Sequence, residues 1–201
     1  MGSIKKQEKA LFIQRLGAYL IDIVIVSFVA TLISMPFIDS KKEEKQQKQV
    51  QEIMELYQKQ EISIEDFSYQ ISDAYYHIAR SSGVNSLIVI TFNLLYFVIY
   101  QLFNKGQTIG KRLFKIRVVS DEGELTANQM LIRSFIANSI LLEMIAFVFM
   151  LFSKKDAYFV SVSFVNGIQY VVTFISIIMI MSKKDGRAIH DKLIKTTVVR
   201  E

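Results

Sequence analysis

Residues Leu16–Ile38 read LGAYLIDIVIVSFVATLISMPFI, an apolar run in which Asp22 is the only charged side chain. A helix needs about 20 apolar residues to cross a hydrocarbon core of about 30 Å, so this run is long enough to span a membrane. A carboxylate inside such a helix costs roughly 2.5–3.5 kcal/mol on insertion scales. Asp22 therefore needs a compensating partner inside the protein. Arg15 shares its helix face but lies too far along the axis to touch it.

A cleavable signal peptide is the main alternative for this run, because Lys5, Lys6 and Lys9 precede it. A signal peptide has a shorter apolar core, and a small-residue cleavage site follows that core. Here the core is too long, it contains Asp22, and no such site follows. We therefore expect the run to be retained as a membrane helix.

Three further apolar runs have about the length of a membrane span: Val84–Phe103, Phe135–Phe152 and Tyr158–Met181. The chain has 201 residues, of which 51% are hydrophobic and one is proline, and its mean hydropathy is +0.30. These values favour a polytopic membrane protein over a soluble domain. We expect an all-α membrane protein with four transmembrane helices, an extracytoplasmic amphipathic helical insertion and small cytoplasmic interfacial motifs.

The expected segments follow from these four spans. They are a cytoplasmic N-terminus with the first transmembrane helix at 1–39, the extracytoplasmic helical insertion at 40–83, the second transmembrane helix at 84–103, a basic cytoplasmic loop at 104–134, the third and fourth transmembrane helices at 135–181, and a basic cytoplasmic C-terminus at 182–201.

Lysine and arginine are unequally distributed between the two sides of the spans, and the side with the excess is expected to be cytoplasmic. One side holds Lys154 and Lys155 in a short loop, and a long segment in which acidic residues dilute the basic ones. The other side carries the excess, so both termini are predicted to be cytoplasmic. The net charge of +5 arises from this bias and does not indicate nucleic-acid binding. The basic residues of that side are Lys5, Lys6, Lys9, Arg15, Lys105, Lys111, Arg112, Lys115, Arg117, Arg133, Lys183, Lys184, Arg187, Lys192, Lys195 and Arg200.

The segment between the first two spans is predicted to form two amphipathic helices outside the membrane. Its first half places Val50, Ile53, Met54 and Tyr57 at helical spacing, and its second half begins with Ser63 and Asp66 in a capping-box-like arrangement. Each apolar stripe must be buried, and we favour packing of the two helices on each other. The membrane surface and a partner protein are the alternatives. The second stripe contains Ile64, Phe67, Ile71, Tyr75 and Ile78.

Two basic segments, Gly106–Val119 and Gly186–Val199, resemble each other when aligned without gaps. They indicate either a repeat of two spans plus one motif or a chance similarity. Each fits a short interfacial helix that continues into a strand. The turn Asp121–Gly123 predicts a small hairpin between Phe114–Ser120 and the segment at Leu125, which Thr196–Val199 could join. The basic residues expected to face anionic lipid headgroups are Lys111, Arg112, Lys115 and Arg117.

Three motifs together resemble the RDD family of prokaryotic membrane proteins: RLGAYLID at Arg15–Asp22, the segment Gly106–Val119, and GRAIHD at Gly186–Asp191. The resemblance identifies Arg15, Asp22 and Asp191 as the arginine and two aspartates that give the family its name. It implies a multi-span protein of a bacterial or archaeal cytoplasmic membrane and suggests solute or ion transport. The segment 40–82 looks like an insertion outside the family pattern.

Polar residues occur in all four spans, and they avoid lipid only by pointing inward. The candidate transport path consists of Asp22, Asn93, Glu143, Asn166 and Gln169. One interpretation is a polar passage or ion site in which Asp22 and Glu143 exchange protons or bind a cation. The other is structural: the polar groups form hydrogen bonds between helices. In that case one Arg15 guanidinium bridges Asp22 and Asp191 at the cytoplasmic interface.

No constellation typical of an enzyme, a metal site or a cofactor site is present. The chain has no cysteine, and its two histidines, His77 and His190, are predicted to lie on opposite sides of the membrane. We therefore expect a non-enzymatic protein without a cofactor. The first hypothesis is a small transporter or exchanger for a cation, proton or solute, working as a homo-oligomer. The alternative is an accessory or regulatory subunit that binds another membrane protein through its outer helices or its basic cytoplasmic face.

Overall fold

The computed structural model describes residues 8–182 and 186–201 of the chain. Four of the lysines used above to orient the spans, Lys5, Lys6, Lys183 and Lys184, lie outside the described residues.

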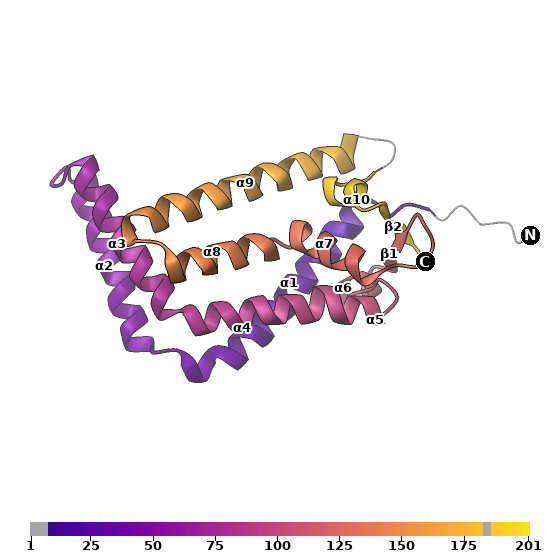
Figure 1. Ribbon diagram of the computed structural model, residues 1–201, viewed down its shortest axis with the longest axis horizontal. Helices are drawn as coiled ribbons and strands as arrows, with labels where there is room; N and C mark the ends of the chain where they lie inside the picture. The colour runs from indigo at the N-terminus through magenta and orange to yellow at the C-terminus, as the bar shows by residue number, and fades with distance from the viewer. Residues whose placement is uncertain (1–7, 183–185) are drawn as a thin grey trace, which may run out of the picture.

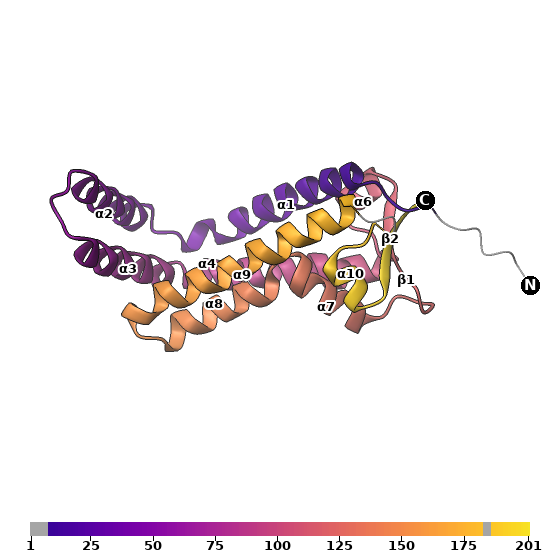
Figure 2. The same cartoon turned by 90° about the horizontal axis from the view of Figure 1, so that it is seen from above.

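Long helices run side by side along the longest dimension of the molecule (Figures 1 and 2). Three of them are long and apolar enough to cross a membrane, at Phe12–Phe37, Gly83–Phe103 and Ala157–Ser182, and a bent helix pair adds a fourth span if the pair is counted as one. The prediction of a helical membrane protein is therefore confirmed. The elements are α1 (Phe12–Ser34) with the 3-10 turn η1 (Met35–Phe37), α4 (Gly83–Leu94) with the π-helix η2 (Leu95–Tyr100) and α5 (Gln101–Phe103), α7 (Ala127–Ala137), α8 (Ile140–Phe152) and α9 (Lys155–Ser182).

The third span is broken, whereas the sequence predicts one continuous helix at Phe135–Phe152. Helices α7 and α8 meet at an angle of 68° at Asn138 and Ser139, and Ser139 adopts a left-handed conformation with φ of 60°. Short polar side chains compete with the helical backbone for hydrogen bonds, and this explains why the helix ends at these two residues. The chain then resumes as α8, where the Glu143 N–H donates to the Ser139 carbonyl at 2.9 Å.

Helices α2 (Ser40–Gln58) and α3 (Ile64–Ser81) form an antiparallel hairpin at one end of the bundle (Figure 1). The Ser63 hydroxyl caps α3 by accepting a hydrogen bond from the Asp66 N–H at 3.0 Å. Ile53, Ile71 and Ala74 form a buried apolar cluster between the two helices. The two helices thus pack on each other through part of their predicted stripes, whereas Met54, Tyr57, Ile64 and Tyr75 of these stripes are exposed.

The two similar basic segments adopt the same local structure at the opposite end of the bundle (Figures 1 and 2). One forms α6 (Ile109–Leu113) followed by β1 (Ile116–Ser120), and the other forms α10 (Ile189–Leu193) followed by β2 (Thr196–Arg200). This confirms the predicted short helix continuing into a strand. Strands β1 and β2 pair antiparallel in a two-stranded sheet.

The predicted hairpin between Phe114–Ser120 and the segment at Leu125 is wrong. Only an isolated bridge joins Ser120 to Gly123, because Thr126 already caps α7 and leaves no length for a returning strand. The partner of β1 is β2, which contains the segment Thr196–Val199 that was expected as a possible additional strand, with Val118 opposite Val198.

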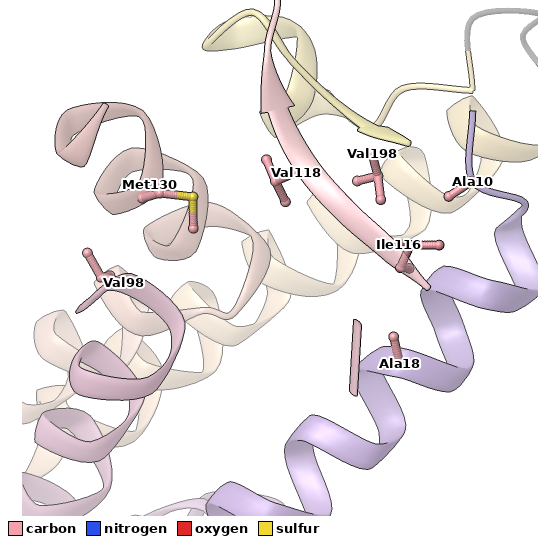
Figure 3. Packing of buried hydrophobic residues seen from close by; sticks show 7 residues of the cluster. All are labelled: Ala10, Ala18, Val98, Ile116, Val118, Met130 and Val198. Carbon is pink, nitrogen blue, oxygen red and sulfur yellow. The ribbon is translucent and has the colours of Figure 1, made fainter. Parts of the chain in front are cut away.

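A compact apolar core lies between this sheet and the helices (Figure 3). Ile116, Val118 and Val198 of the strands pack with residues of α1, η2 and α7. The segment before α1 joins the sheet, since the Ala10 N–H donates to the Val198 carbonyl at 3.0 Å. The first described residues and the last ones therefore lie at the same end of the bundle. The other members of the core are Ala10, Ala18, Val98 and Met130.

Candidate functional site

Asp22 is fully buried on α1 and is held by groups from the second span and the segment after it. Its carboxylate accepts hydrogen bonds from the Tyr96 hydroxyl at 2.6 Å, the Thr108 hydroxyl at 2.5 Å and the Gly110 N–H at 2.8 Å. The Tyr96 hydroxyl also accepts one from the Ile109 N–H at 3.0 Å. These hydrogen bonds stabilise a carboxylate that would otherwise be costly at this depth.

Gly110 is required by this arrangement. A Cβ atom at this position would collide with the Ala18 carbonyl oxygen of α1 and would lie 2.8 Å from the Asp22 Oδ1 atom. Only glycine therefore lets the start of α6 approach α1 closely enough for its N–H to reach the carboxylate.

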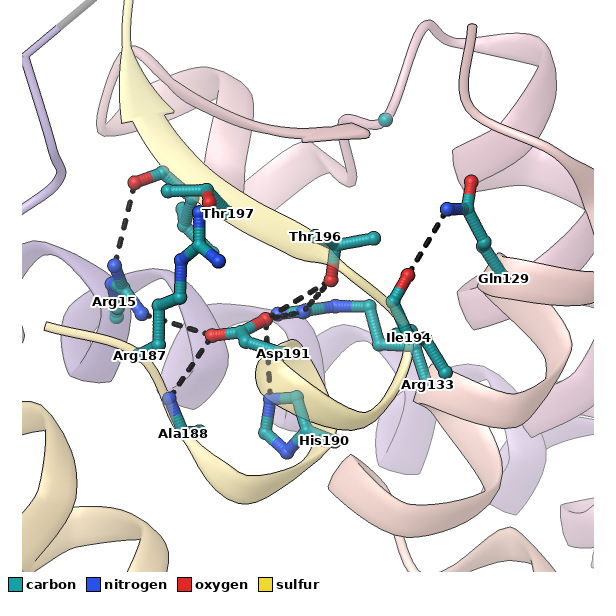
Figure 4. A network of polar contacts seen from close by, with 12 residues as sticks. Arg15, Gln129, Arg133, Arg187, Ala188, His190, Asp191, Ile194, Thr196 and Thr197 are labelled. Atoms are coloured by element: carbon teal, nitrogen blue, oxygen red, sulfur yellow. Dashed lines mark hydrogen bonds and ion pairs between the residues drawn. The ribbon is translucent and has the colours of Figure 1, made fainter. Parts of the chain in front are cut away.

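Asp191 is the second fully buried aspartate, and two arginines share it (Figure 4). Arg15 of α1 lies 3.3 Å from one carboxylate oxygen, and Arg133 of α7 forms an ion pair with the other. The Ala188 N–H donates to the carboxylate at 3.2 Å, and the Arg15 guanidinium also donates to the Val198 carbonyl at 3.3 Å. This cluster ties α1, α7, α10 and β2 together.

Burial and the neighbouring charges together determine the protonation states of Asp191 and His190, which lie outside the spans. Burial alone would raise the pKa of Asp191, but the positive charges of Arg133 and Arg15 outweigh it and lower the pKa to about 2. Burial, with the positive charge of Arg133 beside it, lowers the pKa of His190 to about 3. Asp191 is therefore ionised and His190 neutral at physiological pH.

The structural interpretation of the sequence expected the Arg15 side chain to bridge the two aspartates, but Arg15 does not do so. Instead one carboxylate, Asp191, joins two guanidinium groups, and Asp22 is satisfied separately by hydroxyl and backbone donors. Sequence reasoning missed Arg133, although it is the basic residue closest to the third apolar run, as Arg15 is to the first. It also missed Tyr96, for which no sequence pattern gave a signal, and Thr108, which lies within the motif segment Gly106–Val119.

Glu143 of α8 lies next to Asn93 of α4, whose side-chain amide donates a hydrogen bond to the carboxylate at 3.1 Å. Both residues line a cavity of about 430 Å³ between α1, α4 and α8, which we call the middle cavity. Glu143 and Tyr158 line a cavity of about 270 Å³, the hairpin-end cavity. A third cavity of about 390 Å³ lies between α1, α7, α9 and α10, and we call it the sheet-end cavity.

Neighbouring cavities share wall residues. Asn85 and Glu143 line both the hairpin-end and the middle cavity, and Tyr19, Asn138 and Ser139 line both the middle and the sheet-end cavity. The break between α7 and α8 therefore forms part of the wall between two cavities. Irregular backbone at membrane depth is tolerated where it is buried in protein or lines a cavity, and discontinuous helices form the binding sites of many transporters.

The remaining candidates of the transport path lie apart from one another. Asn166 is exposed on α9, whereas Gln169 lines the sheet-end cavity and donates a hydrogen bond to the Thr173 hydroxyl at 3.1 Å. Asp22 lines none of the three cavities. The structure thus brings Asn93 and Glu143 together and leaves Asp22 and Asn166 outside their site.

The four basic residues expected at lipid headgroups occupy different environments. Lys111 lines the sheet-end cavity, while Arg112 and Lys115 are exposed and Arg117 is half-buried on β1. Their contact with headgroups stays a prediction. No group of three His, Cys, Asp or Glu side chains that could hold a metal ion occurs in residues 8–182 and 186–201.

The fold and these sites define a helical membrane protein with several helices long enough to cross a membrane. The segment at α6 donates hydrogen bonds to Asp22 of α1, and the segment at α10 carries Asp191 next to Arg15 of α1. The sequence profile of the RDD family matches residues 9–195, nearly the whole chain, and the chain belongs to this family. Comparisons with curated proteins and with solved structures found no match.

Proposed function

We propose that this RDD-family protein transports a proton, alone or coupled to a small solute or cation, with Glu143 as the carboxylate that takes up and releases it. The observation that carries the proposal is the position of Glu143 on the wall shared by the hairpin-end and middle cavities. A titratable group that faces two cavities can take up a proton from one cavity and release it to the other, as a proton relay requires. Ionisable residues within membrane helices are costly and commonly mark proton or ion pathways.

The side chains around the sheet-end cavity favour a proton over a metal cation as the ion that passes there. Arg15, Lys111 and Arg133 line this cavity, and their charged groups have no acceptor atom that could bind a metal ion. A proton can instead move along hydroxyl groups and water. Tyr19 and Ser139, on the wall between the middle and sheet-end cavities, supply such hydroxyls.

Asp22 has a positioning role in this proposal and does not relay protons. Its carboxylate already accepts hydrogen bonds from Tyr96, Thr108 and Gly110, which connect α1 to η2 and α6. We assign no catalytic reaction and no cofactor to the chain, and we place both termini in the cytoplasm.

The test is proton flux into proteoliposomes that contain the purified full chain and an internal pH-sensitive dye, under imposed proton, sodium and potassium gradients. Glu143→Gln keeps an oxygen for the Asn93 amide but cannot carry a proton, so flux should fall to that of empty liposomes. Glu124→Gln, an exposed site near the sheet, is the matched control and should transport as the wild type does. Absence of flux in the wild type under every gradient, or normal flux in Glu143→Gln, would contradict the proposal.

The competing function is that of an accessory subunit, and one observation favours it. On the α2–α3 hairpin, outside the apolar spans, Ile64 is 61% and Tyr69 55% exposed, although both are large and apolar or aromatic. A photo-reactive side chain at position 64 would cross-link a membrane-protein partner in cells under this function. Flux by the purified chain together with no cross-linked partner would decide for the transporter.

A further inference from the structure

The sheet-end cavity carries an uncompensated positive charge. Arg15, Lys111 and Arg133 line it, and the buried carboxylates that act on them are Asp22 and Asp191. Three cations and two anions leave a net charge of +1 among these five side chains. His190 also lines the cavity but adds no charge, because its pKa is about 3.

Two buried hydrogen-bonding atoms on the wall of this cavity have no hydrogen-bond partner. Within the described residues the Arg15 Nε atom and the Ser176 Oγ atom are buried without a hydrogen-bond partner. Ser176 is only 7% exposed, and it lies on α9, opposite the α1 helix that carries Arg15. Buried polar atoms without a partner are rare in folded proteins, and each one calls for a physical explanation such as a bound ligand.

Lys111 adds a third donor to the same cavity. Over the described ranges its ammonium makes no ion pair and no side-chain hydrogen bond. Burial lowers its pKa to about 8, and the carboxylate of Asp22 opposes this only in part. An anion beside the ammonium would raise that pKa again, since an opposite charge stabilises the charged form.

The rest of the cavity wall is apolar and continues along the fourth span. Leu16 of α1 and Val172, Ile177 and Ile180 of α9 line it. A small hydrated anion needs no such wall, whereas a lipid places a charged headgroup and an apolar chain side by side. Basic pockets between membrane helices are a known setting for the binding of anionic lipid headgroups.

We propose that the sheet-end cavity binds the phosphate group of an anionic membrane phospholipid, with Arg15, Lys111 and Ser176 as its hydrogen-bond donors and an acyl chain along α9. A single negative charge on the phosphodiester neutralises the net charge of the cluster. The site is distinct from the exposed Arg112 and Lys115, which can meet headgroups only at the membrane surface. The inference does not depend on proton transport, because Glu143 takes no part in it.

The test measures binding of phosphatidylglycerol, phosphatidylcholine and inorganic phosphate to the purified full chain in detergent, by native mass spectrometry and by the shift in Tm. Phosphatidylglycerol should remain bound and raise the Tm, while phosphatidylcholine should do neither. Lys111→Gln should weaken phosphatidylglycerol binding about tenfold, as expected for loss of a charge-assisted hydrogen bond. Arg112→Gln removes the same charge from the neighbouring exposed residue and should leave the affinity within about twofold of wild type.

A second variant keeps the test decisive if Lys111→Gln does not fold. Ser176→Ala leaves every charge in place, and it should weaken phosphatidylglycerol binding several-fold. Equal binding of phosphatidylcholine, equal effects of Lys111→Gln and Arg112→Gln, or unchanged binding in Ser176→Ala would each overturn the proposal. Inorganic phosphate that raises the Tm and displaces the lipid would show that the site takes free phosphate instead.

Discussion

Gly110 controls how closely α6 approaches α1, and a side chain there should separate them. Gly110→Ala places a Cβ atom against the Ala18 carbonyl and the Asp22 carboxylate. The contact can be relieved only by moving α6, which also weakens the hydrogen bond from the residue 110 N–H to Asp22. We expect a loss of about 1–3 kcal/mol in the free energy of unfolding, the usual cost of overpacking, measured as a lower Tm in detergent.

Gly167→Ala is the matched control for this substitution. Gly167 lies within α9, and no atom other than those of its neighbours and of the adjacent helix backbone lies within 4 Å of the position that its Cβ would take. Alanine is a better helix former than glycine, so the control should keep or slightly raise the Tm. An equal loss of stability in both variants would show that close approach at Gly110 is not the cause.

His190 should make the stability of the protein depend on pH. Its pKa is about 3 in the folded protein and about 6.5 when unfolded, so between these values the unfolded chain binds more protons. Stability therefore falls as the pH is lowered through this range, by up to about 1.4 kcal/mol for each pH unit. Thermal unfolding between pH 7 and pH 5 should show a decreasing Tm, and His190→Gln should show a shallower decrease.

The other histidine provides the comparison. The side chain of His77 is 62% exposed on α3, and His77→Gln should reproduce the pH dependence of the wild type. Asp191 does not interfere, because its stabilisation is lost only below about pH 4, as the pH falls toward its own pKa of about 2. A His190→Gln profile as steep as the wild-type profile would mean that the histidine is not buried as a neutral group.

Among the elements, the α2–α3 hairpin holds its own apolar core and should respond to core substitutions locally. Ile71 is 5% exposed within that core, whereas Ile64, at the start of the same helix, is 61% exposed. Ile71→Ala should destabilise the hairpin by about 2–5 kcal/mol, and Ile64→Ala should have little effect. Hydrogen exchange of the amides of α2 and α3 measures the difference. Equal protection in the two variants would show that the helices are not held together by this core.

The helices themselves could be predicted from the sequence because their signals are local. Apolar runs of membrane length gave the spans, and Ser63 followed by Asp66 gave the start of α3. The repeated basic segment gave a short helix followed by a strand in both copies. Each of these signals comes from neighbouring residues in the chain, so the sequence contains it in full.

Features that depend on distant contacts could be predicted only in part. The break at Asn138 and Ser139 lies inside an apolar run, and hydropathy does not distinguish it from a continuous span. The sequence offered Thr196–Val199 as a strand that could join Phe114–Ser120, and this segment does pair with β1, whereas the turn signal at Asp121–Gly123 pointed wrongly to the nearer segment at Leu125. Arg133 shares Asp191 with Arg15 because α10 packs against α7, a contact between segments that lie far apart in the chain.

For the whole molecule, the arrangement in Figures 1 and 2 places the α2–α3 hairpin and the two-stranded sheet at opposite ends of the spans. If the spans cross the membrane as proposed, Glu44 of α2 and Glu124 near the sheet lie on opposite sides of it. The chain has no cysteine, so Glu44→Cys and Glu124→Cys each introduce a single thiol. In intact cells a membrane-impermeant maleimide should label position 44, and it should label position 124 only after the membrane is permeabilised. Labelling of position 124 in intact cells would show that this end of the molecule lies outside the cytoplasm and would contradict the proposed orientation.

The antiparallel pairing of β1 with β2 has a consequence for how the protein is made. Asp191 and strand β2 follow α9 in the chain, so the ribosome synthesises them after α1, α4, α8 and α9. Until they emerge, Arg15 and Arg133 have no shared carboxylate, and β1 has no partner strand. Hydrogen bonds of Asp22 can join α1 to η2 and α6 as soon as these segments are made, but the ion pairs of Asp191 and the pairing of β1 can form only after α9 has been translated. A ribosome that stalls within α9 therefore leaves inserted helices in which Arg15 and Arg133 lack their carboxylate partner and β1 lacks its partner strand.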